Sequence, residues 1–299
     1  MRVDIVMCTF RRPQIGEAIA AIGRMRGLEG LDLRLVIADN DETDSAREAV
    51  GLAARDLPFP CLYLHAPARN ISIARNACLD AAMDAELVAG LDDDEIVSPD
   101  WLAQMIAALR DTGAAAAIGK VVADYPPGTP DWVRRLDYHS SYPERERIPT
   151  ANSGNAIMRW KGTPWQRQRY DIGRGRSGGE DTEFFLRLQR MGMRTVAAPR
   201  ATVTEAVPPA RQTLEWLGSR RFRMGQTHVI TATTPRARAA LLAGAAAKAG
   251  YCRLREALHR GDETRRNFWY LRGQLHRGVC TELLTGRPQA ELYGRSDPV

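Results

Sequence analysis

Residues 87–95 read Leu-Val-Ala-Gly-Leu-Asp-Asp-Asp-Glu, an apolar run that ends in four consecutive acids. The apolar part predicts a buried strand, and the acids follow at its carboxyl end, where open α/β sheets bind ligands. Carboxylates this close repel one another unless a cation offsets their charge. Because Mg²⁺ and Mn²⁺ prefer carboxylate oxygens, the cluster predicts a metal that holds substrate phosphates. The alternative is a solvated acidic turn before a helix that begins near Pro99.

Strands and helices alternate before this stretch. Helices are expected to begin near Ile15, Ser45 and Ser72, from the spacing of their apolar residues. This alternation predicts a parallel sheet with right-handed crossovers. The expected earlier strands are residues 3–9, 33–38 and 61–64.

The pattern is less regular after the acidic cluster. Residues 126–149 are rich in Pro, Arg and Tyr and are expected to form a long functional loop. Residues 170–179 are rich in Gly and Arg and are expected to be mobile. From Leu214 onward the chain is expected to be helical. The other expected elements are helices 101–109 and 180–191, strand 114–122, a short strand after residue 152, and one or two strands in 193–203.

Charge is unevenly distributed along the 299 residues. The net charge is +6, but residues 211–299 hold 16 basic and 7 acidic side chains. A basic C-terminal third favours nucleic acid, an anionic membrane surface or a phosphorylated substrate as partner. The five cysteines are scattered without a C-x-x-C pair, which indicates reduced thiols in the cytoplasm. We expect no secretory leader and no membrane-spanning helix.

Two strand ends carry candidate nucleotide-binding residues. Residues 8–13 read Cys-Thr-Phe-Arg-Arg-Pro and contain no glycine-rich phosphate loop, which favours contact with a base or sugar edge. Arg11 and Arg12 precede a helix, where their charge opposes the helix dipole, so a functional role for one of them is favoured. Asp39 ends the second strand, either to accept hydrogen bonds from a base or ribose or to form a turn.

Two further groups complete the candidate site. Arg75 lies one turn inside a helix, either to bind phosphate or uracil oxygens or to pair with the acidic cluster. Residues 178–181 read Gly-Gly-Glu-Asp at a helix start, where the dipole favours acids by about 0.3–1 kcal/mol each. That effect does not explain the paired glycines. The functional hypothesis makes Asp181 a general base and lets Glu180 hold a substrate hydroxyl.

These blocks, together with residues 38–41, 71–76 and 153–155, occur in an order that resembles family 2 glycosyltransferases of the GT-A fold. The nearest branch is the bacterial exopolysaccharide or succinoglycan-type glucosyltransferases. The resemblance implies an α/β fold with a Rossmann-like, mostly parallel sheet, a UDP-sugar donor and inversion at the anomeric carbon. It implies Mn²⁺ or Mg²⁺ on Asp94, with Asp92 on metal or ribose, and Asp181 as base. The nucleotide-binding residues expected with it are Thr9, Arg11, Asp39, Arg75, Asp92, Asp93 and Arg220.

One departure from the family pattern concerns residues 216–223. Processive members carry a Gln/Arg-x-x-Arg-Trp block, and the spacing here differs. This difference favours transfer of a single sugar, and the family resemblance favours glucose or N-acetylglucosamine as that sugar. Arg220, Arg221 or Arg223 is expected to steady the diphosphate, or else these side chains form an exposed basic helix face.

The basic C-terminal region interleaves apolar residues such as Leu254, Leu258 and Trp269 with arginines. Such a helix suits a membrane interface, and a polyprenyl-diphosphate-linked glycan acceptor at the inner face of the membrane would fit it. The alternative is that these apolar residues pack on the catalytic body. We expect a catalytic domain at 1–212, with halves near 1–97 and 98–212, and a basic helical region at 213–299.

Three other functions were considered. A sugar-nucleotide nucleotidyltransferase would carry a glycine-rich loop after the first strand. A nucleic-acid-binding protein would leave both acidic blocks unexplained, because they repel phosphate without a metal, so we expect no nucleic-acid partner. An inactive sugar-binding relative would not need Asp94 and Asp181. The preferred hypothesis is a cytoplasmic, membrane-peripheral, metal-dependent inverting glycosyltransferase of bacterial surface polysaccharide synthesis.

Overall fold

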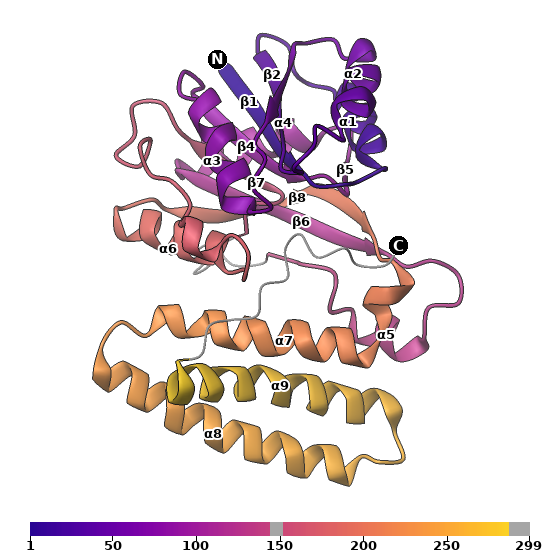
Figure 1. Ribbon diagram of the computed structural model, residues 1–299, viewed down its shortest axis with the longest axis vertical. Helices are drawn as coiled ribbons and strands as arrows, with labels where there is room; N and C mark the ends of the chain where they lie inside the picture. The colour runs from indigo at the N-terminus through magenta and orange to yellow at the C-terminus, as the bar shows by residue number, and fades with distance from the viewer. Residues whose placement is uncertain (144–151, 287–299) are drawn as a thin grey trace. The chain divides into compact units, whose positions relative to one another are not determined.

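The computed structural model describes residues 1–143 and 152–286 (Figure 1). These residues form two compact units. The first unit, Met1–Val122 with Ser140–Glu205, holds the sheet, and the second, Ala123–His139 with the chain from Ala206, is helical. The predicted boundary at residue 212 stays a prediction, and its end at residue 299 lies outside the described residues.

One eight-stranded sheet, in the order β3-β2-β1-β4-β7-β6-β8-β5, forms the centre of the first unit. The four strands at the β3 end pair in parallel, and β7 joins β4 and β6 antiparallel. The predicted βα alternation therefore holds up to β4, and the sheet is mixed beyond it. The strands are β1 (Arg2–Thr9), β2 (Asp32–Asp39), β3 (Cys61–His65), β4 (Leu87–Asp92), β5 (Glu95–Val97), β6 (Ala116–Asp124), β7 (Ala156–Arg159) and β8 (Thr195–Ala206).

Helices cover both faces of this sheet (Figure 1). One face packs on helices α1, α2 and α4, through fully buried residues such as Ile19 and Trp101. The other face packs on α3 and α6, whose Leu79 and Phe184 are buried. The helices of this unit are α1 (Ile15–Gly23), α2 (Arg47–Ala53), α3 (Ile71–Ala81), α4 (Trp101–Thr112) and α6 (Glu180–Arg190).

The second unit is built from four α-helices in the described chain. Its core brings Trp132 of the first helix together with Leu217 and Leu271 of two others. The expected loop at 126–149 is therefore wrong for residues 131–136, which are helical; its end from residue 144 lies outside the described chain. None of the described helices is sufficiently long and apolar to span a bilayer. The four helices are α5 (Asp131–Leu136), α7 (Leu214–His228), α8 (Pro235–Leu258) and α9 (Glu263–Thr285).

Candidate active site

Three neighbouring parallel strands bring the predicted residues to one edge of the sheet. β1 lies between β2 and β4, and its register aligns Thr9 with Asp39 and Cys8 with Asp92. Since parallel strands run in the same direction, these chain ends share the carboxyl edge where α/β sheets bind ligands. The sequence therefore placed Thr9, Asp39 and Asp92 correctly at the ends of their strands.

The four consecutive acids from the end of β4 to the start of β5 take up different surroundings. Asp92 is the most open, with 53% of its side chain exposed, whereas the Asp94 side chain is 22% exposed. Asp93 is buried and accepts a hydrogen bond of 2.8 Å from the Thr9 hydroxyl. Glu95, also buried, accepts one of 2.9 Å from the Asp92 amide. Asp92 and Asp94 are thus the members of the cluster most available to a ligand.

Arg12 offsets part of this negative charge. Its guanidinium lies 3.5 Å from an oxygen of Asp93 and 3.3 Å from one of Asp94. Burial nevertheless raises the pKa of Asp93 to about 7, with the charge of Asp94 adding to the effect and Arg12 opposing it. Arg12 is not among the predicted site residues, although it contacts Asp94, a predicted metal ligand.

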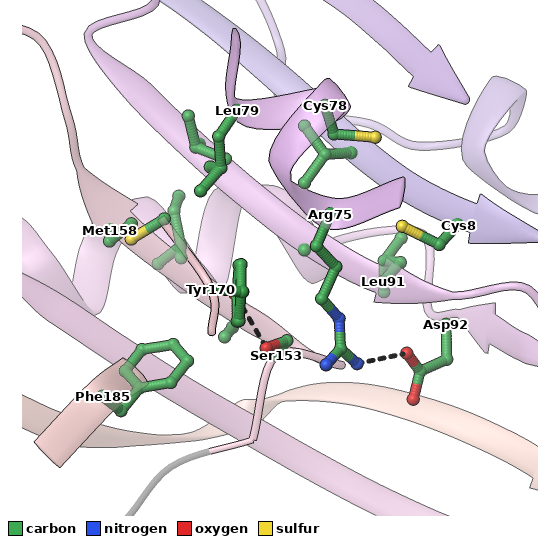
Figure 2. A pocket seen from close by; sticks show the side chains of 15 residues that line it. Cys8, Arg75, Cys78, Leu79, Leu91, Asp92, Ser153, Met158, Tyr170 and Phe185 are labelled. Carbon is green, nitrogen blue, oxygen red and sulfur yellow. Dashed lines mark hydrogen bonds and ion pairs between the residues drawn. The ribbon is translucent and has the colours of Figure 1, made fainter. Parts of the chain in front are cut away.

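Arg75 joins the acidic cluster to Glu180, the neighbour of the predicted base, and Figure 2 shows its contact with Asp92. Its guanidinium lies 2.5 Å from Glu180 Oε1 and 3.9 Å from Asp92 Oδ1. It also lies over the Tyr170 ring, 5.4 Å from the centroid, and the Tyr170 hydroxyl pairs with that of Ser153 at 2.8 Å. Burial alone would lower the Arg75 pKa, but the carboxylates around it, Glu180 foremost, hold it well above its usual value. The structure thus shows Arg75 paired with the acidic cluster, and its contact with phosphate or uracil oxygens stays a prediction.

Asp181 lies in the first turn of α6, beside Glu180. Burial first, and then the charge of Glu180, raise the pKa of Asp181 to about 6, while Arg75 lowers it. One oxygen accepts a hydrogen bond of 2.7 Å from the Thr182 amide. Glu180 Oε2 is buried without a hydrogen-bond partner in the described chain, as a group awaiting a substrate hydroxyl would be. A carboxylate with a pKa near 6 is suited to proton abstraction at neutral pH.

Glycines shape the backbone before α6 and beside Asp92. Gly178 and Gly179 have φ angles of +91° and +83°, which explains the glycine pair ahead of the helix. Gly154 faces Asp92 so closely that an added Cβ would lie 2.6 Å from Asp92 Oδ2. The sequence drew attention to Gly154 only as part of a block.

A small cavity lies behind Arg75 and Asp92 (Figure 2). Its volume is about 40 Å³, and its walls include Cys8, Cys78 and Met158. That is room for a few waters at about 10–15 Å³ each, and not for a sugar or a nucleoside.

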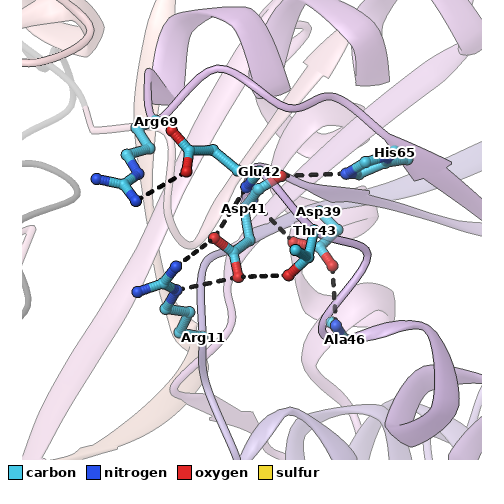
Figure 3. Close-up of polar contacts among 8 residues, drawn as sticks. All are labelled: Arg11, Asp39, Asp41, Glu42, Thr43, Ala46, His65 and Arg69. Carbon is cyan, nitrogen blue, oxygen red and sulfur yellow. Dashed lines mark hydrogen bonds and ion pairs between the residues drawn. The ribbon is translucent and has the colours of Figure 1, made fainter.

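Asp39 is fully buried and its oxygens are in use (Figure 3). They accept hydrogen bonds from the amides of Asp41 and Ala46, at 3.0 and 2.8 Å, and from the Tyr63 hydroxyl at 2.7 Å. This arrangement favours the turn hypothesis, in which Asp39 orders the loop after β2. Its assignment to the nucleoside stays a prediction.

Arg11 is held beside the same loop (Figure 3). Its guanidinium contacts both carboxylate oxygens of Asp41, at 2.9 and 3.0 Å. This hydrogen bonding lowers the pKa of Asp41 to about 2. The Arg11 backbone has a φ of +53°, a costly conformation that tends to occur at functional sites. The sequence did not single out Asp41, although it follows Asp39 in a quoted block.

Arg220 belongs to the second unit, on α7. Its guanidinium lies 5.3 Å from the centroid of the Trp216 ring, which stacks on His139 at 5.4 Å. Its predicted role at the diphosphate stays a prediction.

The donor set fits a metal shared with a substrate. Across residues 1–143 and 152–286, no three His, Cys, Asp or Glu side chains converge to hold a metal ion by themselves. Mg²⁺ is usually bound by one or two carboxylates together with substrate phosphates and water. Asp94 and the exposed Asp92 supply such a pair, so a diphosphate would have to complete the coordination.

The fold and the site define an α/β enzyme of the GT-A class, with carboxylates, arginine and a candidate base at the carboxyl edge of its sheet. The chain belongs to glycosyl transferase family 2, whose model matches residues 4–171. This membership confirms the predicted family, fold class and enzyme class.

Two kinds of relative support the assignment. The chain is 43% identical over 230 residues to "Succinoglycan biosynthesis protein ExoM" of Rhizobium meliloti, covering 76% of this chain and 74% of that protein. Among solved structures, the mannosyltransferase PcManGT from Pyrobaculum calidifontis with GDP-Man and Mn²⁺ aligns with a TM-score of 0.60 and 21% identity, covering 94% of this chain and 87% of that one. GalNAc-T7 with UDP, GalNAc and Mn²⁺ aligns with a TM-score of 0.53 and 13% identity, over 75% and 51%. The two structures support the fold.

Proposed function

We propose that this enzyme transfers one sugar from a UDP-sugar to a glycan acceptor, with inversion and with a divalent metal. The observation that carries the proposal is the position of Arg75, which contacts Asp92 and Glu180, the latter 105 positions away in the chain. Through Arg75, the predicted donor-binding carboxylates and the predicted base belong to one site.

The chemistry needs one displacement. Asp181 takes the proton of the acceptor hydroxyl, which attacks the anomeric carbon from the face opposite the nucleotide, and UDP leaves with the bonding electrons. Glu180 accepts a hydrogen bond from a sugar hydroxyl and keeps Arg75 in place. The transition state resembles an oxocarbenium ion, as in glycoside hydrolysis. Asp94 and Asp92 would hold Mn²⁺ or Mg²⁺, which supplies positive charge to the leaving diphosphate.

The nucleoside side of the site is assigned four residues, namely Thr9, Asp93, Arg11 and Asp39. Thr9 and Asp93 act as a pair, since the Thr9 hydroxyl donates to Asp93. Asp39 acts through the loop that it orders, and Arg11 through its contact with Asp41. Arg220 is assigned to the diphosphate.

The relative at 43% identity supports the proposed pathway. Because that relative is named as a succinoglycan biosynthesis protein, we assign this enzyme to bacterial surface polysaccharide synthesis. Glucose or N-acetylglucosamine is the proposed sugar, and a polyprenyl-diphosphate-linked glycan at the inner face of the membrane is the proposed acceptor. The enzyme would work in the cytoplasm, attached to that face without spanning it.

The direct test is the replacement Asp181→Asn, which keeps the shape of the side chain but removes the base. Sugar transfer from UDP-sugars to membrane-extracted acceptor lipids should fall by at least about 10³-fold, in line with the loss of a general base and its charge. Binding of UDP with Mn²⁺, measured by calorimetry, should change little. Normal turnover by the variant would show that Asp181 is not the base.

A further inference from the structure

The outward face of α8 is apolar, the reverse of an ordinary surface helix. Tyr251, Leu254 and Leu258 are 51%, 57% and 68% exposed. At 100° per residue, these three side chains project from one side of the helix. Most other exposed residues on this side of α8 are small, among them Ala243, Ala246, Ala247, Gly250 and Ala257, and Arg236 lies on the same side in the first turn.

Basic residues flank this face on both sides. Along one margin, a groove between α8 and α9 is lined by Arg253 from α8, by Arg260 just after the end of that helix, and by Arg266 and Arg277 from α9. Glu256 is the one carboxylate among the groove residues. None of the four arginines forms an ion pair within the part of the chain that the structure describes. The groove therefore presents uncompensated positive charge to a partner.

The opposite margin is basic and aromatic. Lys248 and Arg255 lie there, and Arg255 sits over the rings of Tyr251 and Trp269, at 5.9 and 5.0 Å. The two rings contact each other at 5.5 Å. Aromatic rings beside basic side chains are enriched at the interface between membrane and water.

The charge of α8 favours an anionic lipid surface over a second copy of the protein as the partner of this face. α8 carries five basic residues and one acidic residue, so a second copy of the same face would be repelled. An anionic lipid surface instead attracts such residues by about 1 kcal/mol each, while exposed Tyr and Leu enter the boundary between headgroups and acyl chains.

We propose that the outer face of α8, with the arginine groove beside it, binds the surface of an anionic phospholipid bilayer. Tyr251, Leu254 and Leu258 enter the interface, and Arg253, Arg260, Arg266 and Arg277 bind lipid phosphates. The inference rests on the proposed function for its setting, a membrane-bound acceptor, but its test does not require sugar transfer.

The test is sedimentation of the full chain with vesicles made of equal parts phosphatidylglycerol and phosphatidylcholine, or of phosphatidylcholine alone. The protein should bind the anionic vesicles in a salt-sensitive manner and should not bind the neutral vesicles. The variant with Arg253→Gln, Arg260→Gln, Arg266→Gln and Arg277→Gln should bind at least about tenfold more weakly. Leu254→Ser with Leu258→Ser should also weaken binding.

Two matched controls separate this face from general charge and hydrophobicity. Replacing four exposed arginines of the first unit by Gln, at Arg24, Arg26, Arg55 and Arg200, removes the same charge and should leave binding within about twofold. Leu52→Ser with Leu284→Ser removes two other exposed leucines and should also have little effect.

Several results would overturn the inference. The first is that the wild type does not bind anionic vesicles. The second is that the arginine variant and its control lose vesicle binding equally. The third is that the wild type forms a dimer that Leu254→Ser with Leu258→Ser abolishes. Binding of a DNA oligonucleotide that depends on the same arginines, with vesicle binding unchanged, would assign the groove to nucleic acid. UDP–Mn²⁺ binding measured on the same samples reports separately on the proposed function.

Discussion

Asp181, the proposed general base, should make the activity depend on pH. Its pKa is raised to about 6 by burial and by Glu180. A general base must be ionised, so kcat/KM should fall tenfold per pH unit below about pH 6. The folded state holds this proton more tightly than the unfolded state, so the contribution of Asp181 to the unfolding free energy decreases as pH rises from about 4 to about 6.

The pH prediction is checked by the pH–rate profile and by urea unfolding of the wild type and Asp181→Asn at several pH values. The difference in unfolding free energy between the two proteins should change between about pH 4 and 6 and be constant above. An acid limb near pH 4 would mean that the Asp181 pKa is not raised.

Replacement of Gly154 is expected to displace Asp92. An added Cβ would meet Asp92 Oδ2 at 2.6 Å, so Gly154→Ala should displace Asp92 and lower the affinity for UDP with Mn²⁺ by about tenfold, which corresponds to about 1.4 kcal/mol. Gly51→Ala is the control, because nothing lies within 4 Å of a Cβ there. Unchanged affinity of Gly154→Ala in calorimetry would show that the position of Asp92 does not matter for binding.

At the scale of elements, Asn70 connects α3 to the segment before α6. Its Oδ1 accepts from the amides of Ser72 and Ile73, as an N-cap, and its Nδ2 donates to the Ile172 carbonyl at 2.9 Å. The residue is buried. Since α3 carries Arg75, this side chain helps to fix the link between Asp92 and Glu180.

Asn70→Ala should lower the unfolding free energy by about 2 kcal/mol, because it loses both the helix cap and the hydrogen bond to the Ile172 carbonyl. Asn70→Asp keeps the cap and loses only the donor, so its cost should be smaller. Urea denaturation of the three proteins checks this order. Equal stability of all three would mean that neither interaction contributes.

Periodicity and strand-end residues predicted the elements up to β4, since each strand there is an apolar run followed by a helix with one apolar face. They also placed Thr9, Asp39, Asp92 and Asp181. β5 escaped prediction because its three residues, Glu95–Val97, are too few to show a period. α5 escaped because Pro and Tyr around it favoured a loop.

The role of Asp39 and the availability of each acid depend on three-dimensional contacts, which the sequence pattern does not reveal. Asp39 could equally bind a base or order a turn, and only its three hydrogen-bond donors favour the turn. Tyr63, the donor from β3, is distant from Asp39 in sequence. The availability of Asp92 and Asp94, in contrast to Asp93 and Glu95, depends on burial that four consecutive acids do not reveal.

At the scale of the whole molecule, the proposed donor site lies at the carboxyl edge of the sheet. We propose that Asp92 and Asp94 there share a divalent metal with the diphosphate of a nucleotide. The described residues lack a three-ligand metal cluster, so metal and nucleotide should each bind weakly alone and strongly together.

The most direct measurement is the thermal unfolding of the full chain with UDP, GDP and other nucleotides, with and without Mn²⁺ or Mg²⁺. A ligand at about 100 times its dissociation constant stabilises the folded state by about 2.7 kcal/mol, which is visible in Tm. The account predicts a rise in Tm with UDP only when metal is present, and no rise for Asp94→Ala. No shift with any nucleotide, or an equal shift in Asp94→Ala, would contradict it.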